Sequence, residues 1–126
     1  SCVLQVSAGT HRVLLPGDIE REAERRLLRQ GRIGPVTVVI APHHGSATSS
    51  SAAFVAALAP SLVIVAAGFG NRWGLPDAGV VRRWQQAGAQ VLTTADSGAV
   101  RFEACAGAGI GPVYRHRLAK RRIWHE

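Results

Sequence analysis

Two adjacent histidines follow an apolar run near the middle of the chain. The run covers residues 36–41, and His43 and His44 come just after it. A continuous apolar run predicts a strand that is covered on both faces. Open α/β sheets bind ligands beyond the carboxyl ends of such strands, and imidazole is the commonest metal-ligating side chain in proteins. The histidines therefore predict metal or phosphate chemistry at this edge of a sheet.

A carboxylate occupies the corresponding place upstream. Asp18 follows the apolar residues 13–16 and Gly17, and a charged helical pattern comes next. Asp18 can cap that helix, ligate an ion, or do both through its two oxygens. Because adjacent side chains point in opposite directions, we expect only one of His43 and His44 to face the ion. The other would orient it or contact the substrate, so these strand ends predict half of a metal site.

Hydroxyl and aromatic side chains extend the candidate site. Ser46 and Ser49 belong to a Ser/Thr cluster before a short helix, which suits either an anion site or an ordinary helix cap. Asn71, Arg72 and Trp73 follow the next apolar run and suit phosphate and base, unless the indole covers the core.

A serine nucleophile is an alternative. It would place Ser46 or Ser49 beside a histidine that Asp18 orients, but the chain has no Gly-x-Ser-x-Gly elbow.

The elements that must position these residues alternate between strand and helix. Strands are predicted over 2–6, 11–15, 36–41, 62–67, 90–93 and 99–103, and helices over 19–29, 51–58 and 77–87. The order β-β-α-β-α-β-α-β-β predicts an α/β fold. Residues 96–98 are expected to join the last two strands in a hairpin. Beyond it, we divide the chain into a domain over 1–104 and a glycine-rich linker with a basic tail over 105–126.

Composition sets further bounds. The chain has 126 residues and a net charge of +7, with five cations between 115 and 122. Such a tail can meet phosphate or anionic lipid, or remain solvated. There is no apolar run of membrane-spanning length and no signal-peptide pattern. The chain lacks Met and begins at Ser1, so we expect a processed product or an excised fragment. Cys2 and Cys105 are expected to be buried free thiols, although a disulfide is allowed.

Several motifs together resemble the metallo-β-lactamase-like domain of the ComEC family of DNA-internalisation competence proteins. They are Leu-Pro-Gly-Asp-Ile-Glu at 15–20, Ala-Pro-His-His-Gly-Ser at 41–46, Asn-Arg-Trp-Gly-Leu-Pro at 71–76 and Thr-Thr-Ala-Asp-Ser-Gly-Ala-Val at 93–100. The resemblance covers residues 2–104. It implies the C-terminal half of an αββα sandwich, in which the missing half would leave one apolar sheet face exposed for self-association.

The resemblance also implies a function. It suggests a non-membrane domain of a bacterial inner-membrane channel protein, on the extracytoplasmic side, whose intact form hydrolyses the DNA strand that is not imported. Asp18 and His43 would be metal ligands for zinc or manganese, with His44 the near alternative to His43. Asp18, His43 and His44 would be catalytic. Ser46, Ser49, Asn71, Arg72 and Trp73 would contact DNA.

Two departures bear on activity. The family's His-x-x-x-Asp-His motif is absent, and Leu75 stands where the family has histidine in Gly-His-Pro. Because Asp18 and one histidine cannot fill a metal site, we expect the isolated chain to be inactive. The parent is then either a metal-dependent nuclease or a degenerate module that guides DNA with Arg72, Trp73 and the basic tail. A small-molecule hydrolase of the same fold is a third reading.

Overall fold

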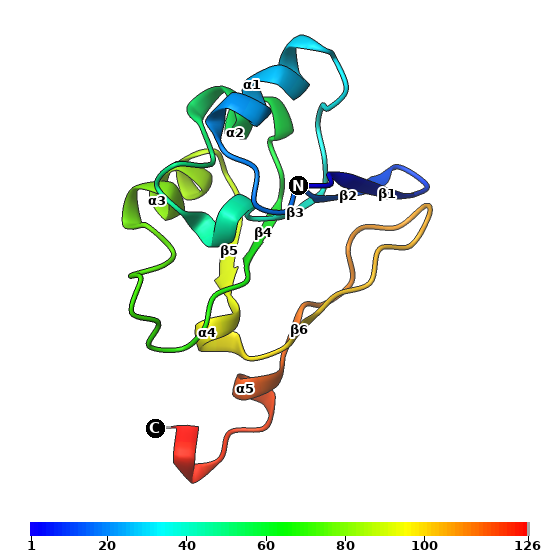
Figure 1. Ribbon diagram of the computed structural model, residues 1–126. Coiled ribbons are helices and arrows are strands. Elements are labelled where there is room, and N and C mark those ends of the chain that lie inside the picture. Colours follow the sequence, from blue (N-terminus) through cyan, green and yellow to red (C-terminus); the bar gives the residue numbers. More distant parts are fainter. Residues whose placement is uncertain (126) are drawn as a thin grey trace.

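Five strands form one sheet in the order in which they occur in the chain (Figure 1). The computed structural model describes residues 1–125. The strands are β1 (Leu4–Ala8), β2 (His11–Leu15), β3 (Val38–Ile40), β4 (Leu62–Val65) and β5 (Gln90–Thr93). β1 and β2 form an antiparallel hairpin, whereas β2, β3, β4 and β5 run parallel to one another. The predicted mixed α/β fold is confirmed, and the half-sandwich remains a prediction.

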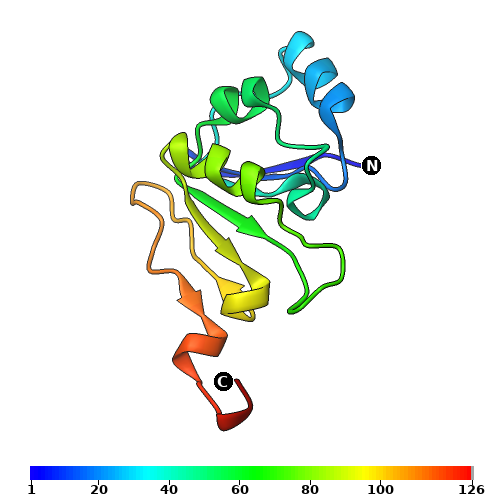
Figure 2. The same ribbon diagram turned by 90° about the vertical axis from the view of Figure 1, so that its left-hand side faces the viewer.

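Three helices connect the parallel strands and cover one face of the sheet (Figure 2). They are α1 (Arg21–Arg29), α2 (Ala52–Leu58) and α3 (Ala78–Gln86). Their apolar side chains meet the sheet in one core, in which Phe54 and Trp84 are fully buried. Ser51 and Asp77 cap α2 and α3 by accepting hydrogen bonds from backbone N–H groups, as Ser and Asp do at helix starts.

The predicted last hairpin is wrong. Residues after β5 form the short helix α4 (Thr94–Ser97), because the Thr93 hydroxyl accepts a hydrogen bond from the Asp96 N–H and caps a helical turn. Strand β6 (Val100–Arg101) then pairs with β7 (Tyr114–Arg115), far along the chain, instead of with β5. The final elements are α5 (His116–Ala119) and the 3-10 turn η2 (Ile123–His125).

The C-terminal segment covers part of the second sheet face (Figure 1). Residues 100–113 pack apolar side chains against β3, β4 and β5 from the side opposite the helices. We had expected this face to be exposed along its whole length, and the structure shows that it is partly covered. It remains open over the β1–β2 hairpin, where Leu4 and Val6 are 57% and 48% exposed. Self-association through this remnant stays a prediction.

Two smaller expectations are also corrected. Cys2 and Cys105 are free, as predicted, but exposed and not buried. Asp18 does not cap α1, because that helix begins later and Glu20 occupies its N-cap position. Within residues 1–125, no helix has the length and apolar character needed to cross a membrane.

Candidate metal and phosphate site

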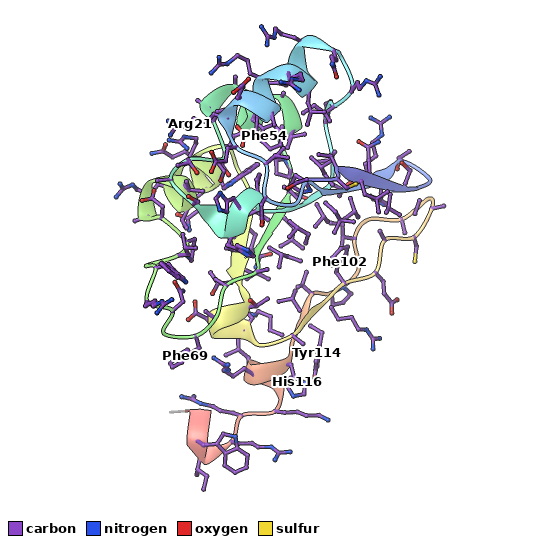
Figure 3. The ribbon with its side chains drawn as sticks, viewed as in Figure 1. Arg21, Phe54, Phe69, Phe102, Tyr114 and His116 are labelled. Carbon is purple, nitrogen blue, oxygen red and sulfur yellow. The ribbon has the colours of Figure 1, made fainter. Side chains whose placement is uncertain are left out.

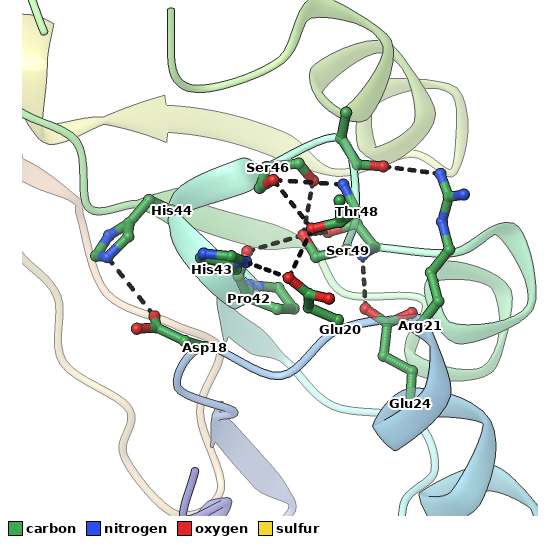
Figure 4. Close-up of polar contacts among 12 residues, drawn as sticks. Asp18, Glu20, Arg21, Glu24, Pro42, His43, His44, Ser46, Thr48 and Ser49 are labelled. Atoms are coloured by element: carbon green, nitrogen blue, oxygen red, sulfur yellow. Dashed lines mark hydrogen bonds and ion pairs between the residues drawn. The ribbon is translucent and has the colours of Figure 1, made fainter. Parts of the chain in front are cut away.

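The carboxyl ends of β2, β3 and β4 meet at one edge of the sheet, and the candidate residues follow them there (Figure 4). Asp18 comes after β2. The 3-10 turn η1 (Pro42–Gly45) comes after β3 and carries both histidines. The loop over residues 66–77 comes after β4. The topology therefore gathers three segments that are far apart in sequence, as the sequence reasoning expected.

Both histidines adopt left-handed backbone conformations. His43 has φ 49° and ψ 43°, and His44 has φ 56° and ψ 25°. Such conformations cost a non-glycine residue about 1–3 kcal/mol and concentrate at functional sites. Backbone hydrogen bonds hold the turn: the His43 N–H donates to the Gly17 carbonyl at 3.0 Å, and the Ser46 N–H donates to the His43 carbonyl at 2.9 Å. The fold thus maintains an unfavourable turn that presents two imidazoles.

Asp18 lies beside His44 and not beside His43. Nδ1–H of His44 donates to the Ala66 carbonyl at 2.8 Å, since a carbonyl can only accept. In the neutral ring this leaves the lone pair on Nε2, which is 3.6 Å from Oδ1 of Asp18. Two acceptors that face each other at this distance repel unless a proton or a cation lies between them. Both side chains are about half exposed, so water reaches the pair, and a cation bound between the two atoms would be stabilised by both.

The second histidine is paired with a carboxylate that the sequence reasoning did not single out. Nδ1 of His43 is 3.2 Å from Oε1 of Glu20. The ring is not aligned for an N–H···O bond, so this buried nitrogen has no hydrogen-bond partner among the described residues. Glu20 lies two residues after Asp18. The sequence signal for Glu20 is that it is the second acidic residue of the motif at 15–20, which also contains Asp18.

The serine cluster serves mainly to organise the turn. The Thr48 hydroxyl donates to Oε1 of Glu20 at 3.1 Å and also lies 3.1 Å from the Ser46 hydroxyl. Ser49 is fully buried, and its hydroxyl donates to the carbonyls of Pro42 and Ser46. Ser46 thus lies near Glu20 and His43, whereas Ser49 faces the interior. No serine hydroxyl among the described residues is bonded to a histidine, so nothing assembles a nucleophile–base pair.

The loop after β4 places its polar residues differently from one another. The Asn71 side chain forms its hydrogen bonds within the loop. Its Nδ2 donates to the carbonyls of Gly68 and Leu75, and its Oδ1 accepts from the Leu75 N–H. Arg72 and Trp73 point outward, and the Arg72 guanidinium lies 4.4 Å from the indole centroid. The indole does not fold over the core, which was the alternative considered from sequence.

Two open cavities of about 330 Å³ each adjoin at His44 and Ala66. One lies toward the β1–β2 hairpin and is lined by Asp18 together with mostly apolar side chains. The other lies toward the loop after β4 and is lined by Trp73 and Leu75. His44 therefore stands on the ridge between an apolar pocket with one carboxylate and a pocket with an exposed indole.

The donor set fits part of a divalent-metal site. In tetrahedral zinc sites with bonds of about 2.0–2.1 Å, neighbouring ligand atoms lie about 3.3 Å apart, close to the Asp18–His44 separation. The Ala66 carbonyl orients the imidazole as outer-shell partners of metal-bound histidines do. Across residues 1–125, however, no group of three or more His, Cys, Asp or Glu side chains could hold an ion. Among residues 1–125, these side-chain types therefore supply a pair of ligands and not a complete shell.

Gly45 fixes the exit from the histidine turn, and Gly45→Ala should destabilise the fold by about 2 kcal/mol. Its φ is +74°, and an added Cβ would lie 2.7 Å from Cβ of Pro76. Gly74→Ala is a matched control, because Gly74 also has a positive φ but nothing within 4 Å of the added Cβ. Urea titrations followed by circular dichroism would compare the two. Equal losses would show that the Pro76 contact is unimportant.

Comparison with known proteins identifies three informative relatives. The chain is 36% identical to competence protein ComA of Neisseria gonorrhoeae over 121 residues, which is 94% of this chain and 17% of that protein. It is 37% identical to recombination protein 2 of Haemophilus influenzae over 80% of this chain and 13% of that protein. It is 30% identical to ComE operon protein 3 of Bacillus subtilis over 90% of this chain and 15% of that protein. No protein-family model matches the chain.

The match is extensive for this chain and small for the relatives. The chain spans between 13% and 17% of the length of these three proteins.

Proposed function

Since this chain is homologous to one segment of the ComEC-type competence proteins, we propose that it takes part in DNA uptake as the ligand-bearing edge of a metal-dependent phosphodiesterase. Two relatives are named for competence or its operon and one for recombination, which supports a role in DNA uptake. The hydrolytic activity, the metallo-β-lactamase-like fold, the DNA substrate and the channel protein around it belong to the proposal.

The Asp18–His44 pair carries the proposal. Its two acceptor atoms face each other at 3.6 Å, and the Ala66 carbonyl holds the imidazole with Nε2 toward the carboxylate. This arrangement favours His44 over His43 as the ligand, with Asp18 as its companion. A bound zinc or manganese ion would supply Lewis-acid charge that stabilises negative charge on phosphodiester oxygens. The remaining ligands would come from other parts of the much longer protein.

His43 and Glu20 have a separate role in the proposal. Nδ1 of His43 is buried against Glu20, and the side chain as a whole is 36% exposed. The Glu20 carboxylate lies 3.2 Å from this nitrogen and limits the orientations that the ring can take. His43 would donate or accept a proton at a substrate oxygen, with Glu20 as its positioning residue.

Metal affinity should separate the two histidines. Calorimetric titration of the chain with Mn²⁺ or Zn²⁺ should show weak binding that Asp18→Asn or His44→Ala reduces at least tenfold, because each removes one of two ligands. His43→Ala should leave this affinity within about twofold, since its ring faces Glu20. Glu22→Gln on the exposed face of α1 is the carboxylate control. A larger effect of His43→Ala than of His44→Ala would reverse the ligand assignment.

Activity requires the longer protein. We would replace the homologous segment of the gonococcal relative with this chain and measure metal-dependent cleavage of labelled linear DNA. Loss of cleavage with Asp18→Asn, His44→Ala and His43→Ala would support the proposal. In this assay His43→Ala should lower cleavage while metal affinity is retained.

A DNA-guiding module without hydrolysis is the second candidate. Leu75 favours this candidate, because an apolar side chain lines the cavity that His44 borders, beside the exposed Arg72–Trp73 pair. DNA binding by the chimera with no cleavage at any metal concentration, unchanged by Asp18→Asn, would select this candidate.

A further inference from the structure

Ser49 connects the two ends of the histidine turn from inside the protein (Figure 4). Its side chain is fully buried, and its hydroxyl lies 2.9 Å from the Pro42 carbonyl and 2.9 Å from the Ser46 carbonyl. Since a carbonyl can only accept, the hydroxyl shares its proton between these two oxygens. His43 and His44 lie between Pro42 and Ser46 in the chain, so this buried hydroxyl joins the backbone on both sides of the two imidazoles.

The peptide unit between Pro42 and His43 is held at both of its polar atoms. Its N–H donates to the Gly17 carbonyl at 3.0 Å, and its carbonyl accepts from the Ser49 hydroxyl. Because a peptide unit is planar and φ of His43 is a rotation about one of its edges, the two bonds restrict this angle, which is 49°. A non-glycine residue keeps such a conformation where the surrounding structure over-determines it, as these bonds do here.

The exit from the turn is held in a similar way. The Ser46 carbonyl accepts from the N–H of Ser49 at 3.0 Å as well as from its hydroxyl. The Gly45 carbonyl accepts from the Asp77 N–H at 2.9 Å. Ser49 thus contributes to both the entry and the exit of the turn.

The helices behind the sheet fix the residue that follows Ser49. The N–H of Ser50 donates to Oε1 of Glu24 at 2.6 Å, and its carbonyl accepts from Nη1 of Arg83 at 2.6 Å. The Ser50 hydroxyl accepts from Nε1–H of Trp84 at 3.2 Å. Since Glu24 belongs to α1 and the other two to α3, two helices hold the backbone beside Ser49.

The residues that precede Ser49 are tied to α1 as well. The N–H of Arg21 donates to the Thr48 carbonyl at 3.2 Å, and its guanidinium donates to the Ala47 carbonyl at 2.7 Å. Figure 3 shows Arg21 in the helical layer, at the end of the molecule opposite to His116. The backbone on either side of Ser49 is therefore held by the helical layer, and its hydroxyl extends this support to the turn.

We propose that Ser49 is a positioning residue of the candidate site. Its hydroxyl keeps the turn in the left-handed conformation that directs Nε2 of His44 toward Asp18 and sets the His43 ring against Glu20. In this role Ser49 acts through the backbone and not by contact with a substrate. Its effect on metal binding rests on the proposed function, whereas its effect on the conformation of the turn does not.

NMR spectroscopy of the 126-residue chain in EDTA tests the effect on the turn. A residue with positive φ gives a strong intraresidue nuclear Overhauser effect, because its amide proton lies close to its Hα. Ser49→Ala leaves the carbonyl of the buried Pro42 without this donor, so the peptide unit should rotate and the effect at His43 should fall by about half. Ser49→Thr keeps the hydroxyl and should retain most of the effect.

Ser51→Ala is the matched control. The Ser51 hydroxyl accepts from the Phe54 N–H at 3.3 Å and caps α2, so its loss also destabilises the protein. Urea denaturation would report a loss of stability in both alanine variants, but the Overhauser effect at His43 should fall in Ser49→Ala alone. Equal reductions in the two variants would mean that general destabilisation moves the turn, and would overturn the role of Ser49.

Calorimetric titration with Mn²⁺ separates this inference from the proposed function. Ser49→Ala should weaken Mn²⁺ binding about tenfold, as the loss of an outer-shell contact does, and Ser51→Ala should leave it unchanged. An unchanged Overhauser effect in Ser49→Ala, or unchanged Mn²⁺ affinity in a chain that binds the ion, would overturn the role of Ser49. If the unsubstituted chain binds no Mn²⁺ while Ser49→Ala alone alters the turn, the result supports Ser49 as the positioning residue and counts against the metal site.

Discussion

Trp84→Ala should lower the free energy of unfolding by about 3–5 kcal/mol, the largest loss we expect from one substitution. The indole of Trp84 is fully buried between α3 and the sheet, and its ring meets that of Phe54 edge to face at 6.5 Å. Its Nε1–H donates to the buried Ser50 hydroxyl at 3.2 Å. Truncation would leave a large cavity and remove that hydrogen bond. Urea denaturation followed by circular dichroism measures the loss.

A second tryptophan provides the control for this substitution. Trp73→Ala removes an equal volume from the exposed loop after β4 and should change stability by no more than about 0.5 kcal/mol. Trp84→Phe keeps most of the apolar volume but lacks the hydrogen-bond donor. Its loss in the free energy of unfolding should lie between the losses for Trp84→Ala and Trp73→Ala. If Trp73→Ala cost as much as Trp84→Ala, the exposed indole would have to be part of the core.

Glu24→Ala should cost about 3–4 kcal/mol, although a helix glutamate is ordinarily a tolerant position. The side chain is fully buried, and its two oxygens accept hydrogen bonds from the N–H groups of Ser50 and Ser51 at 2.6 and 2.8 Å. These N–H groups lie just before α2 and would lose their acceptor inside the protein. The carboxylate also lies at the positive end of the α2 dipole. Thermal and urea denaturation would both report the loss.

The same helix carries a matched control. Glu22→Ala removes an exposed carboxylate that is 3.7 Å from Arg26, and surface pairs of this kind contribute little. Its expected effect is within about 0.5 kcal/mol. Glu24→Gln keeps the size and one acceptor oxygen, so it should recover part of the loss. Equal effects of Glu22→Ala and Glu24→Ala would mean that the buried carboxylate does not hold the α2 start.

The main body of the sheet was predictable because its strands are covered on both faces and read as apolar runs. Residues 36–41 and 62–67 contain β3 and β4, and Val80 and Trp84 fall on the inner face of α3 as predicted. The end of the chain was not predictable from local patterns. Pairing of β6 with β7 joins residues on either side of a long loop, and Thr93 favours a helix cap over a hairpin turn.

The sequence predicted where in the fold the site lies, but it did not predict which of the site's side chains contact one another. Parallel strands force Asp18 and the histidines to one edge, so their proximity follows from topology. The pairing of Asp18 with His44 depends on left-handed backbone at two non-glycine residues, which no local propensity predicts. Glu24 offered a signal, since it lies three and four residues before Leu27 and Leu28 and thus near the inner face of α1.

Each of the strands β2 to β5 pairs with the strand that precedes it in the chain, so the sheet can assemble in the order of synthesis. Each new strand finds its neighbour already in place, and the helix just made covers the side facing the common core. Each parallel pair is separated in the chain by one helical crossover, and closing such a unit costs less entropy than pairing strands from opposite ends of the chain. A nascent chain that has reached the end of β5 therefore already contains the histidine turn and its helical cover, and only residues 100–113 remain to shield the other face.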